Sequence, residues 1–144
     1  MSILVFSHEL KVSRNAIDTN LHVNNVSYIQ WMQDAAIAHS EALGFSMEFY
    51  VNSGESWVAR SHYIEYLKPA FLDDDIVVQT WITNIKRTMS ERHYAFFRKS
   101  DKVLLASAKT LWVYIDMKTG RPIAIPKNLT DKYIAQESYK PTLA

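Results

Sequence analysis

The most extended hydrophobic pattern of this chain lies between residues 24 and 44. Apolar residues recur there at helical spacing, at Val26, Ile29, Met32, Ala35, Ala36 and Leu43. Asn24 is a favourable N-cap ahead of the pattern, and Gly44 is a favourable terminator after it. We predict one helix of about 20 residues, roughly 30 Å long, whose apolar stripe must lie across a wide sheet.

Segments rich in β-branched and aromatic residues predict five strands. They lie at about 4–14, 57–67, 75–86, 90–100 and 103–116. One strand, a long helix and then four strands joined by short turns is an α+β order, with a curled, mostly antiparallel five-stranded sheet around one long central helix. The spacing of Leu129, Tyr133 and Ile134 predicts a short surface helix over 128–137. Without a repeat or a linker, residues 1–144 form a single predicted domain.

Charge and cysteine content exclude several functional classes. The 16 basic and 15 acidic residues give a net charge of +1, so no global field favours nucleic acid or an acidic membrane. There are no cysteines, which excludes a disulfide framework, a thiolate nucleophile and a zinc ribbon. The start, Met1–His8, lacks a basic segment followed by a long apolar one, and no run of about 18 apolar residues occurs. We predict a cytoplasmic protein without a membrane span.

A polar loop directly precedes the predicted helix. It contains Asp18, Asn20 and His22, followed by the cap Asn24 and the first helical residue, Asn25. The first turn of a helix has free backbone N–H groups, so a carboxylate would face an anion-stabilising helix end, as in an acyl-transfer site. The structural alternative is that these Asp, Asn and His residues only cap the helix and shape the turn.

The spacing Asp-x-x-x-His-Val-Asn-Asn-x-x-Tyr, from Asp18 to Tyr28, resembles the signature of hotdog-fold thioesterases of the 4-hydroxybenzoyl-CoA thioesterase group. Within that group the resemblance is nearest to bacterial long-chain acyl-CoA thioesterases. The segments Ile64–Ala70 and Thr110–Pro122 are similar to later elements of the same group. The resemblance extends from about Val5 to about Tyr133.

This resemblance implies a hotdog fold and hydrolysis of acyl-CoA thioesters to free acid and CoA, with fatty acyl-CoA favoured and an acyl-carrier-protein thioester as a further option. It maps the catalytic acid onto Asp18 and the carbonyl-polarising N–H onto Asn25 or its neighbour. Asp18 would be ionised at neutral pH, so it could act as a general base or as a nucleophile, and the residues leave that choice open. The reaction requires no cofactor and no metal.

Asn20 and His22 also match plant acyl-carrier-protein thioesterases, which use the corresponding Asp, Asn and His. The Glu and Cys that complete that arrangement fall near Pro69 and Ala70, so the full plant set is not present. His22 could share the proton transfer, or it could orient the loop and tune Asp18. This chain has Leu21 where many members of the group have Gly or Gln. It has Ala16 where the group often has a second Asp.

Other residues carry weaker signals, each with a structural alternative. Trp31, Met32, Met47, Phe49 and Tyr50 could line an acyl tunnel or form plain core. His62 reads as a packed or surface strand residue. The basic residues near strand ends could meet the CoA phosphates or could be solvated ends; they are Lys86, Arg87, Arg92, Arg98, Lys99 and Lys102.

Two other functional classes fit the same fold. A hotdog dehydratase or hydratase would change the enoyl group of a thioester, and a non-catalytic acyl-thioester-binding protein would bind without turnover. Strand 103–116 is apolar on both faces, whereas one helix covers only one face. The remaining apolar surface predicts a homodimer or homotetramer, and similar thioesterases place active sites between subunits.

Overall fold

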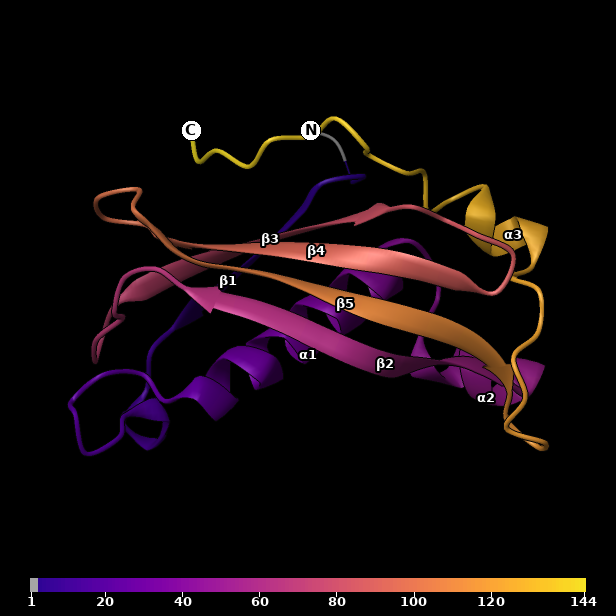
Figure 1. The fold of residues 1–144 in the computed structure, drawn as a ribbon, viewed down its shortest axis with the longest axis horizontal. Coiled ribbons are helices and arrows are strands. Elements are labelled where there is room, and N and C mark those ends of the chain that lie inside the picture. The colour runs from indigo at the N-terminus through magenta and orange to yellow at the C-terminus, as the bar shows by residue number, and fades with distance from the viewer. Residues whose placement is uncertain (1–2) are drawn as a thin grey trace.

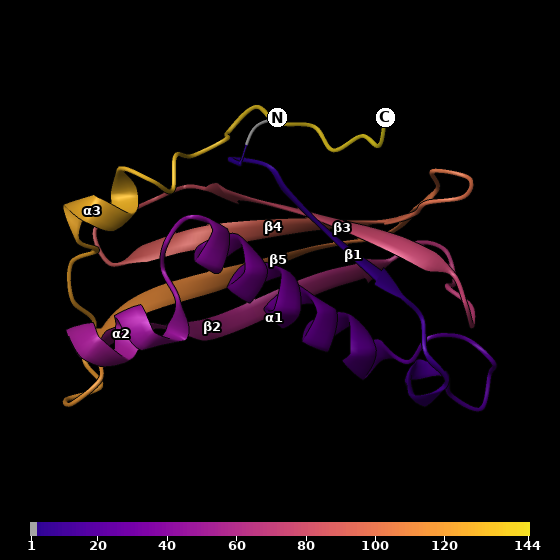
Figure 2. The same cartoon turned by 180° about the vertical axis from the view of Figure 1, so that it is seen from behind.

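The computed structural model describes residues 3–144, so the first two residues of the predicted domain lie outside the described residues. Five antiparallel strands form one sheet in the order β1-β3-β4-β5-β2. Their bounds are β1 Phe6–Lys11, β2 Glu55–Tyr66, β3 Asp75–Thr83, β4 Met89–Arg98 and β5 Leu104–Asp116. Helix α1, Asn25–Ala42, lies across one face of this sheet, behind it in Figure 1 and in front of it in Figure 2. The predicted α+β arrangement is confirmed.

Helix α1 begins where the sequence predicts, but it buries a different stripe. The cap side chain of Asn24 accepts a hydrogen bond from the Ser27 N–H at 2.8 Å. The buried residues are Tyr28, Met32, Ala35, Ala36 and His39. The prediction that Val26 and Ile29 face the sheet is wrong, since their exposures are 75% and 40%. The buried row includes a tyrosine and a histidine, which an analysis of purely apolar spacing does not count.

The core between α1 and the sheet is divided along the helix. Around the first half of α1, Tyr28 and Met32 pack with Ile76, Val78 and Phe96. Beyond the second half, a separate cluster is formed by Phe45, Ile82, Tyr114, Leu129 and Tyr133. Each fully buried side chain of this kind contributes about 1.5–3 kcal/mol.

The C-terminal segment covers part of the opposite face of the sheet. Tyr139 and Leu143 pack against Trp81 and Phe97. Gln79 Nε2 donates a hydrogen bond to the Thr142 carbonyl at 2.8 Å, and the Tyr139 hydroxyl donates to Gln79 Oε1 at 2.7 Å. The chain's own tail therefore covers part of the apolar surface that the sequence assigned to a partner subunit.

The minor helices differ from the prediction. Helix α2, Met47–Ser53, was not predicted; it is only seven residues long and is bounded by the cap Ser46 and by Gly54 at φ 71°. Helix α3 spans Lys127–Thr130 instead of 128–137. The chain leaves the helix because the Gln136 N–H donates to the Ile82 carbonyl of β3 at 2.8 Å. A 3-10 turn, η1, covers Arg14–Ala16. No helix within residues 3–144 has the length and apolarity needed to cross a membrane.

Candidate active site

The loop before α1 is a tight, backbone-bonded turn. The Asp18 N–H donates to the His22 carbonyl at 2.9 Å, and the Leu21 N–H donates to the Asp18 carbonyl at 3.0 Å. The Asp18 carboxylate accepts the Asn20 N–H at 2.9 Å through Oδ1. Leu21 has φ 64°, a left-handed conformation that costs a residue other than glycine about 1–2 kcal/mol. This chain therefore has leucine at a position where glycine would adopt the same conformation without strain.

The start of α1 presents free hydrogen-bond donors. The Asn24 N–H donates to the Ala16 carbonyl at 2.7 Å, and the Ser27 N–H is capped by the Asn24 side chain. The N–H groups of Asn25 and Val26 have no acceptor among the described residues. These two donors lie at the positive end of an 18-residue helix, where negative charge is stabilised.

A cavity of 260 Å³ opens beside this helix start. It is lined by His22, Val23, Asn25, Tyr28, Tyr66, Leu67, Lys68, Pro69 and Ala70. The segment 66–70 reaches the loop because the Val23 N–H donates to the Ala70 carbonyl at 2.9 Å. The Tyr66 hydroxyl also donates to the Asn25 carbonyl at 3.4 Å. Two segments about 45 residues apart therefore build one site.

Arg98 fixes the far wall of this cavity. Its Nη2 donates to the Pro69 carbonyl at 2.7 Å, and it forms ion pairs with Asp74 at 3.0 Å and Asp101 at 2.9 Å. Asp74 in turn accepts the Phe71 N–H at 2.9 Å. Together these bonds hold Arg98, the Pro69 carbonyl and the Asp74 carboxylate in one arrangement. Arg98 is therefore a structural residue of the 69–74 turn, and the expectation of a phosphate contact is not supported for it.

The four predicted site residues divide into two pairs. His22 and Asn25 line the 260 Å³ cavity, whereas Asp18 and Asn20 do not. The Asp18 side chain is half-buried and shapes the turn through Asn20. The ring of His22 packs edge-on against Phe71, with centroids 5.4 Å apart, and makes no hydrogen bond among the described residues. The four residues are close together in the sequence, but within one subunit only two of them line the cavity.

Tyr28, Tyr66 and Lys68 line the cavity although they were not predicted as site residues. Burial, together with the neighbouring Tyr66, raises the pKa of Tyr28 to about 12, so its phenol stays protonated at neutral pH. The ring of Tyr28 lies edge-on to Tyr66 and to Phe96, at 5.2 Å in both cases. The Tyr-x-x-Pro-Ala spacing was the available signal for Tyr66, but only the tertiary fold brings it to the loop.

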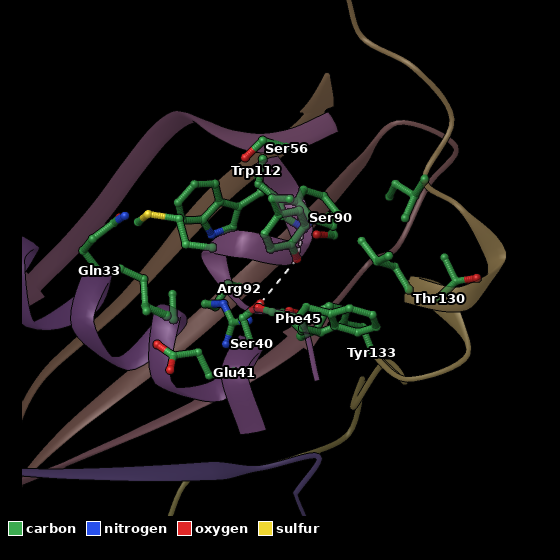
Figure 3. Close-up of a pocket in the computed structure, with 18 of the residues that line it drawn as sticks. Gln33, Ser40, Glu41, Phe45, Ser56, Ser90, Arg92, Trp112, Thr130 and Tyr133 are labelled. Carbon is green, nitrogen blue, oxygen red and sulfur yellow. Dashed lines mark hydrogen bonds between the residues drawn. The ribbon is translucent and has the colours of Figure 1, made fainter. Parts of the chain in front are cut away.

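The remaining predicted candidates have different positions. Trp31 and Met32 belong to the core, whereas Met47 and Tyr50 line a second cavity of 390 Å³ near the other end of α1 (Figure 3). His62 lies on β2, with Nδ1 2.7 Å from the Thr110 hydroxyl. Arg92 is buried and Lys99 pairs with Glu9 at 2.7 Å, so neither is a free surface cation. Within residues 3–144 no group of three or more His, Asp or Glu side chains is placed to hold a metal ion.

The chain shares its length and fold with known proteins. The acyl-CoA thioester hydrolase YbgC of Escherichia coli O6:H1 is 26% identical over 136 residues, which are 92% of this chain and 98% of that protein. The long-chain acyl-CoA thioesterase FadM of E. coli K12 is 22% identical over 86% of this chain and 93% of its own. The protein SAV2348 of Staphylococcus aureus, solved in complex with CoA, has a TM-score of 0.83 and 18% identity, covering 97% of this chain and 96% of that one.

The predicted relationship is confirmed at the level of family and fold. The match to the family described as the thioesterase-like superfamily covers residues 12–133. The relatives that align over most of the chain are acyl-CoA thioester hydrolases, and the solved structures share the hotdog fold. This protein therefore belongs to the thioesterase-like superfamily.

Proposed function

We propose that this protein hydrolyses acyl-CoA thioesters, with fatty acyl-CoA as the substrate class. The observation that carries the proposal is the start of α1, where the N–H groups of Asn25 and Val26 have no acceptor among the described residues and Asn25 lines a cavity, in a chain of the thioesterase-like superfamily. The FadM relationship supports a fatty acyl group, since that relative acts on long-chain acyl-CoA.

In the proposed mechanism the thioester carbonyl oxygen accepts hydrogen bonds from the Asn25 and Val26 N–H groups, and the helix start stabilises the negative charge that develops on it. In the general-base route Asp18 takes a proton from water as the water oxygen bonds to the carbonyl carbon; the C–S bond then breaks and the sulfur takes up that proton, which gives a carboxylic acid and CoA thiol. In the nucleophilic route the Asp18 carboxylate attacks the carbonyl carbon, the C–S bond breaks to leave a mixed anhydride and CoA thiolate, and water then hydrolyses the anhydride to release the acid and restore Asp18, with one proton of that water passing to the thiolate.

The exposed Lys68 at the rim of the cavity is our candidate contact for a CoA phosphate. Its ammonium forms no ion pair among the described residues, and phosphate oxygens are good acceptors for such a donor. Lys68→Met is expected to raise KM about three- to ten-fold with little change in kcat. An unchanged KM would exclude this contact.

The site is completed, in our proposal, by a second copy of the chain. Asp18 does not line the single-chain cavity, so a partner surface is needed to close a cleft between it and the helix start. Strand β2 ends the sheet order, and its outer backbone edge is unpaired within the described chain. Exposed apolar residues lie along α1 and β2, at Val26, Ile29, Ile37, Val58, Tyr63 and Tyr66. These observations favour a homodimer that pairs through β2.

Sedimentation velocity and activity across the same dilution series test the dimer. Val58→Lys, on the proposed edge, is expected to shift the protein toward monomer and to lower activity in parallel. Ile134→Lys is the matched control, because Ile134 is also exposed but lies in the C-terminal segment. A fully active monomer would refute the shared site.

Free-thiol detection with a panel of fatty acyl-CoA and aryl-CoA substrates tests the activity and its preference together. Thiol release that is fastest with fatty acyl-CoA supports the proposal. A change in enoyl absorbance without thiol release would indicate a dehydratase or hydratase instead. Saturable binding without turnover would indicate an acyl-thioester-binding protein.

A further inference from the structure

The 390 Å³ cavity is distinct from the one beside the start of α1. It is enclosed by the second half of α1, by α2, by the sheet and by the segment that follows β5 (Figure 3). The lining residues of the two cavities that lie nearest along α1 are Tyr28 and Gln33, five residues apart, which corresponds to roughly 7.5 Å at 1.5 Å per residue. The two cavities share no lining residue.

Most of the lining is apolar and aromatic. Trp57, Trp112 and Tyr133 provide flat surfaces, and Ile82 and Leu129 fill the gaps between them. The lining also includes Met47, Val51 and Met117, whose exposures of 50–74% place the mouth of the cavity on this side of the described chain. Such a cavity is suited to an apolar ligand.

Arg92 brings a positive charge into this apolar lining. Its exposure is 4%, and its Nη1 donates to His39 Nδ1 at 2.9 Å and to the Thr80 hydroxyl at 3.0 Å. No carboxylate of residues 3–144 forms an ion pair with it. A buried cation without a counter-ion is costly, so this arrangement is unusual for a purely structural residue.

The partners of Arg92 orient it without neutralising it. Burial, and secondarily the Arg92 charge, lowers the pKa of His39 to about 4, so the imidazole is neutral near pH 7. Its Nδ1 must then accept from Arg92, while Nε2 donates to the Ile3 carbonyl at 2.6 Å. The C-terminal end of α1 supplies only about half a negative charge, which leaves the guanidinium partly uncompensated.

Arg92 lines the cavity and has donors beyond Nη1. Nε and Nη2 have no acceptor among the described residues. Arg92 is itself a lining residue, so part of its side chain reaches the cavity although its exposure is only 4%. Ser90, two residues earlier on the same face of β4, adds a buried hydroxyl to the lining. In Figure 3 the Arg92 side chain lies between Ser40 and Trp112.

We propose that this cavity binds an apolar monocarboxylate, with its carboxylate on Arg92 and Ser90 and its tail against Trp57, Trp112 and Tyr133. A 150 Å³ apolar cavity is known to hold benzene, so 390 Å³ has room for roughly ten to fifteen carbon atoms. A carboxylate supplies the missing counter-charge and matches the fork of guanidinium donors. Acids released by the proposed hydrolysis fall in this class, but binding requires no catalysis.

The first test compares decanoate with 1-decanol on the unmodified protein by titration calorimetry. The tails are nearly the same and only decanoate carries a charge. Decanoate is expected to bind about ten- to a hundred-fold more tightly, the usual range for a hydrogen bond to a charged group. Equal affinities, or no binding of decanoate, would overturn the proposal, and this comparison needs no variant to fold.

The second test locates the ligand. Arg92→Met is expected to weaken decanoate binding by the same ten- to hundred-fold and to leave 1-decanol binding nearly unchanged. Arg87→Met, which removes an exposed cation, is the matched control and should bind decanoate as the unmodified protein does. Asp18→Asn should also bind normally. Loss of binding in Asp18→Asn, or normal binding in Arg92→Met, would place the ligand elsewhere and refute the assignment.

Discussion

The two ends of α1 differ in the groups that could bind negative charge. At the first end, the N–H groups of Asn25 and Val26 have no acceptor among the described residues, and Asn25 lines a small, partly polar cavity. At the second end, the helix carries a partial negative charge, and a cation must come from the sheet, which supplies Arg92. We therefore expect the backbone to stabilise a transient oxyanion at the first end, and the binding of a stable anion at the second end to depend on one side chain.

The largest expected effect concerns the carboxylate of the first end. Asp18→Asn should lower kcat by about 10² to 10⁴, the usual contribution of a positioned acid or base, and should leave the fold intact. Thiol-release kinetics with circular dichroism provide the measurement. Asp75→Asn, which removes an exposed carboxylate paired with Lys11, is the control. Near-normal hydrolysis by folded Asp18→Asn would remove Asp18 from the mechanism.

A second substitution removes one backbone donor. Asn25→Pro deletes the N–H of Asn25 at a helix position where proline is well tolerated, and the extended conformation of Asn24, φ −74° and ψ 157°, suits a residue before proline. We expect kcat to fall about 10²- to 10³-fold with little loss of stability. Asn25→Ala keeps the N–H and is the control. Similar kinetics for both variants would show that this donor does not act on the carbonyl.

We expect the stability of the protein to decrease in acid because of His39, near the C-terminal end of α1. The unfolded chain protonates His39 at its ordinary pKa of 6.5, whereas the folded chain does so only near 4. Between these values the unfolded state binds more protons, so the free energy of unfolding falls as the pH decreases, by about 3 kcal/mol across the window. Urea unfolding at pH 7.5, 6.5, 5.5 and 4.5 measures this decrease.

His39→Gln is the matched variant, because an amide can accept from Arg92 and donate to Ile3 without titrating. Its unfolding free energy should depend less on pH over the same range. His93, whose pKa is also lowered by burial, contributes a decrease that remains in both proteins. Identical pH dependence with and without His39 would contradict the neutral-imidazole arrangement.

His22→Gln separates a positional role of His22 from a chemical one. The ring contacts Phe71 and makes no hydrogen bond among the described residues, so we expect this variant to keep activity within about ten-fold of the original. Thiol release at saturating substrate gives the ratio. A loss as large as that of Asp18→Asn would instead assign His22 a share of the proton transfer.

The smallest expected effect concerns the strained turn. Leu21→Gly relieves a positive φ but makes the unfolded chain more flexible, so the two contributions oppose each other. We expect the free energy of unfolding to rise by no more than about 1 kcal/mol, with kcat unchanged. Thermal unfolding measures the shift. A clear decrease in stability would mean that the Leu21 side chain stabilises the loop.

Local features of the chain could be predicted because their causes are local. The Asn24 cap, the start of α1 and the five strands depend on residues close in the sequence, and all of them form, although β1 is shorter than the predicted 4–14. The inward stripe of α1 was partly wrong, since Tyr28 and His39 are buried through aromatic packing and a hydrogen bond to a distant strand. The spacing of apolar residues does not predict the burial of polar residues that find such partners.

The sequence by itself determined the loop from Asp18 to Asn25, with the helix start that leaves its donors free. The tertiary structure alone decided that Tyr66–Ala70 forms the opposite wall of that cavity and that Arg92 meets His39, 53 residues away in the chain. Capping and turns depend on neighbouring backbone groups. The position of Arg92 in an apolar cavity depends on how α1 packs on the sheet. That packing involves residues far apart in the sequence, so a local sequence pattern does not predict it.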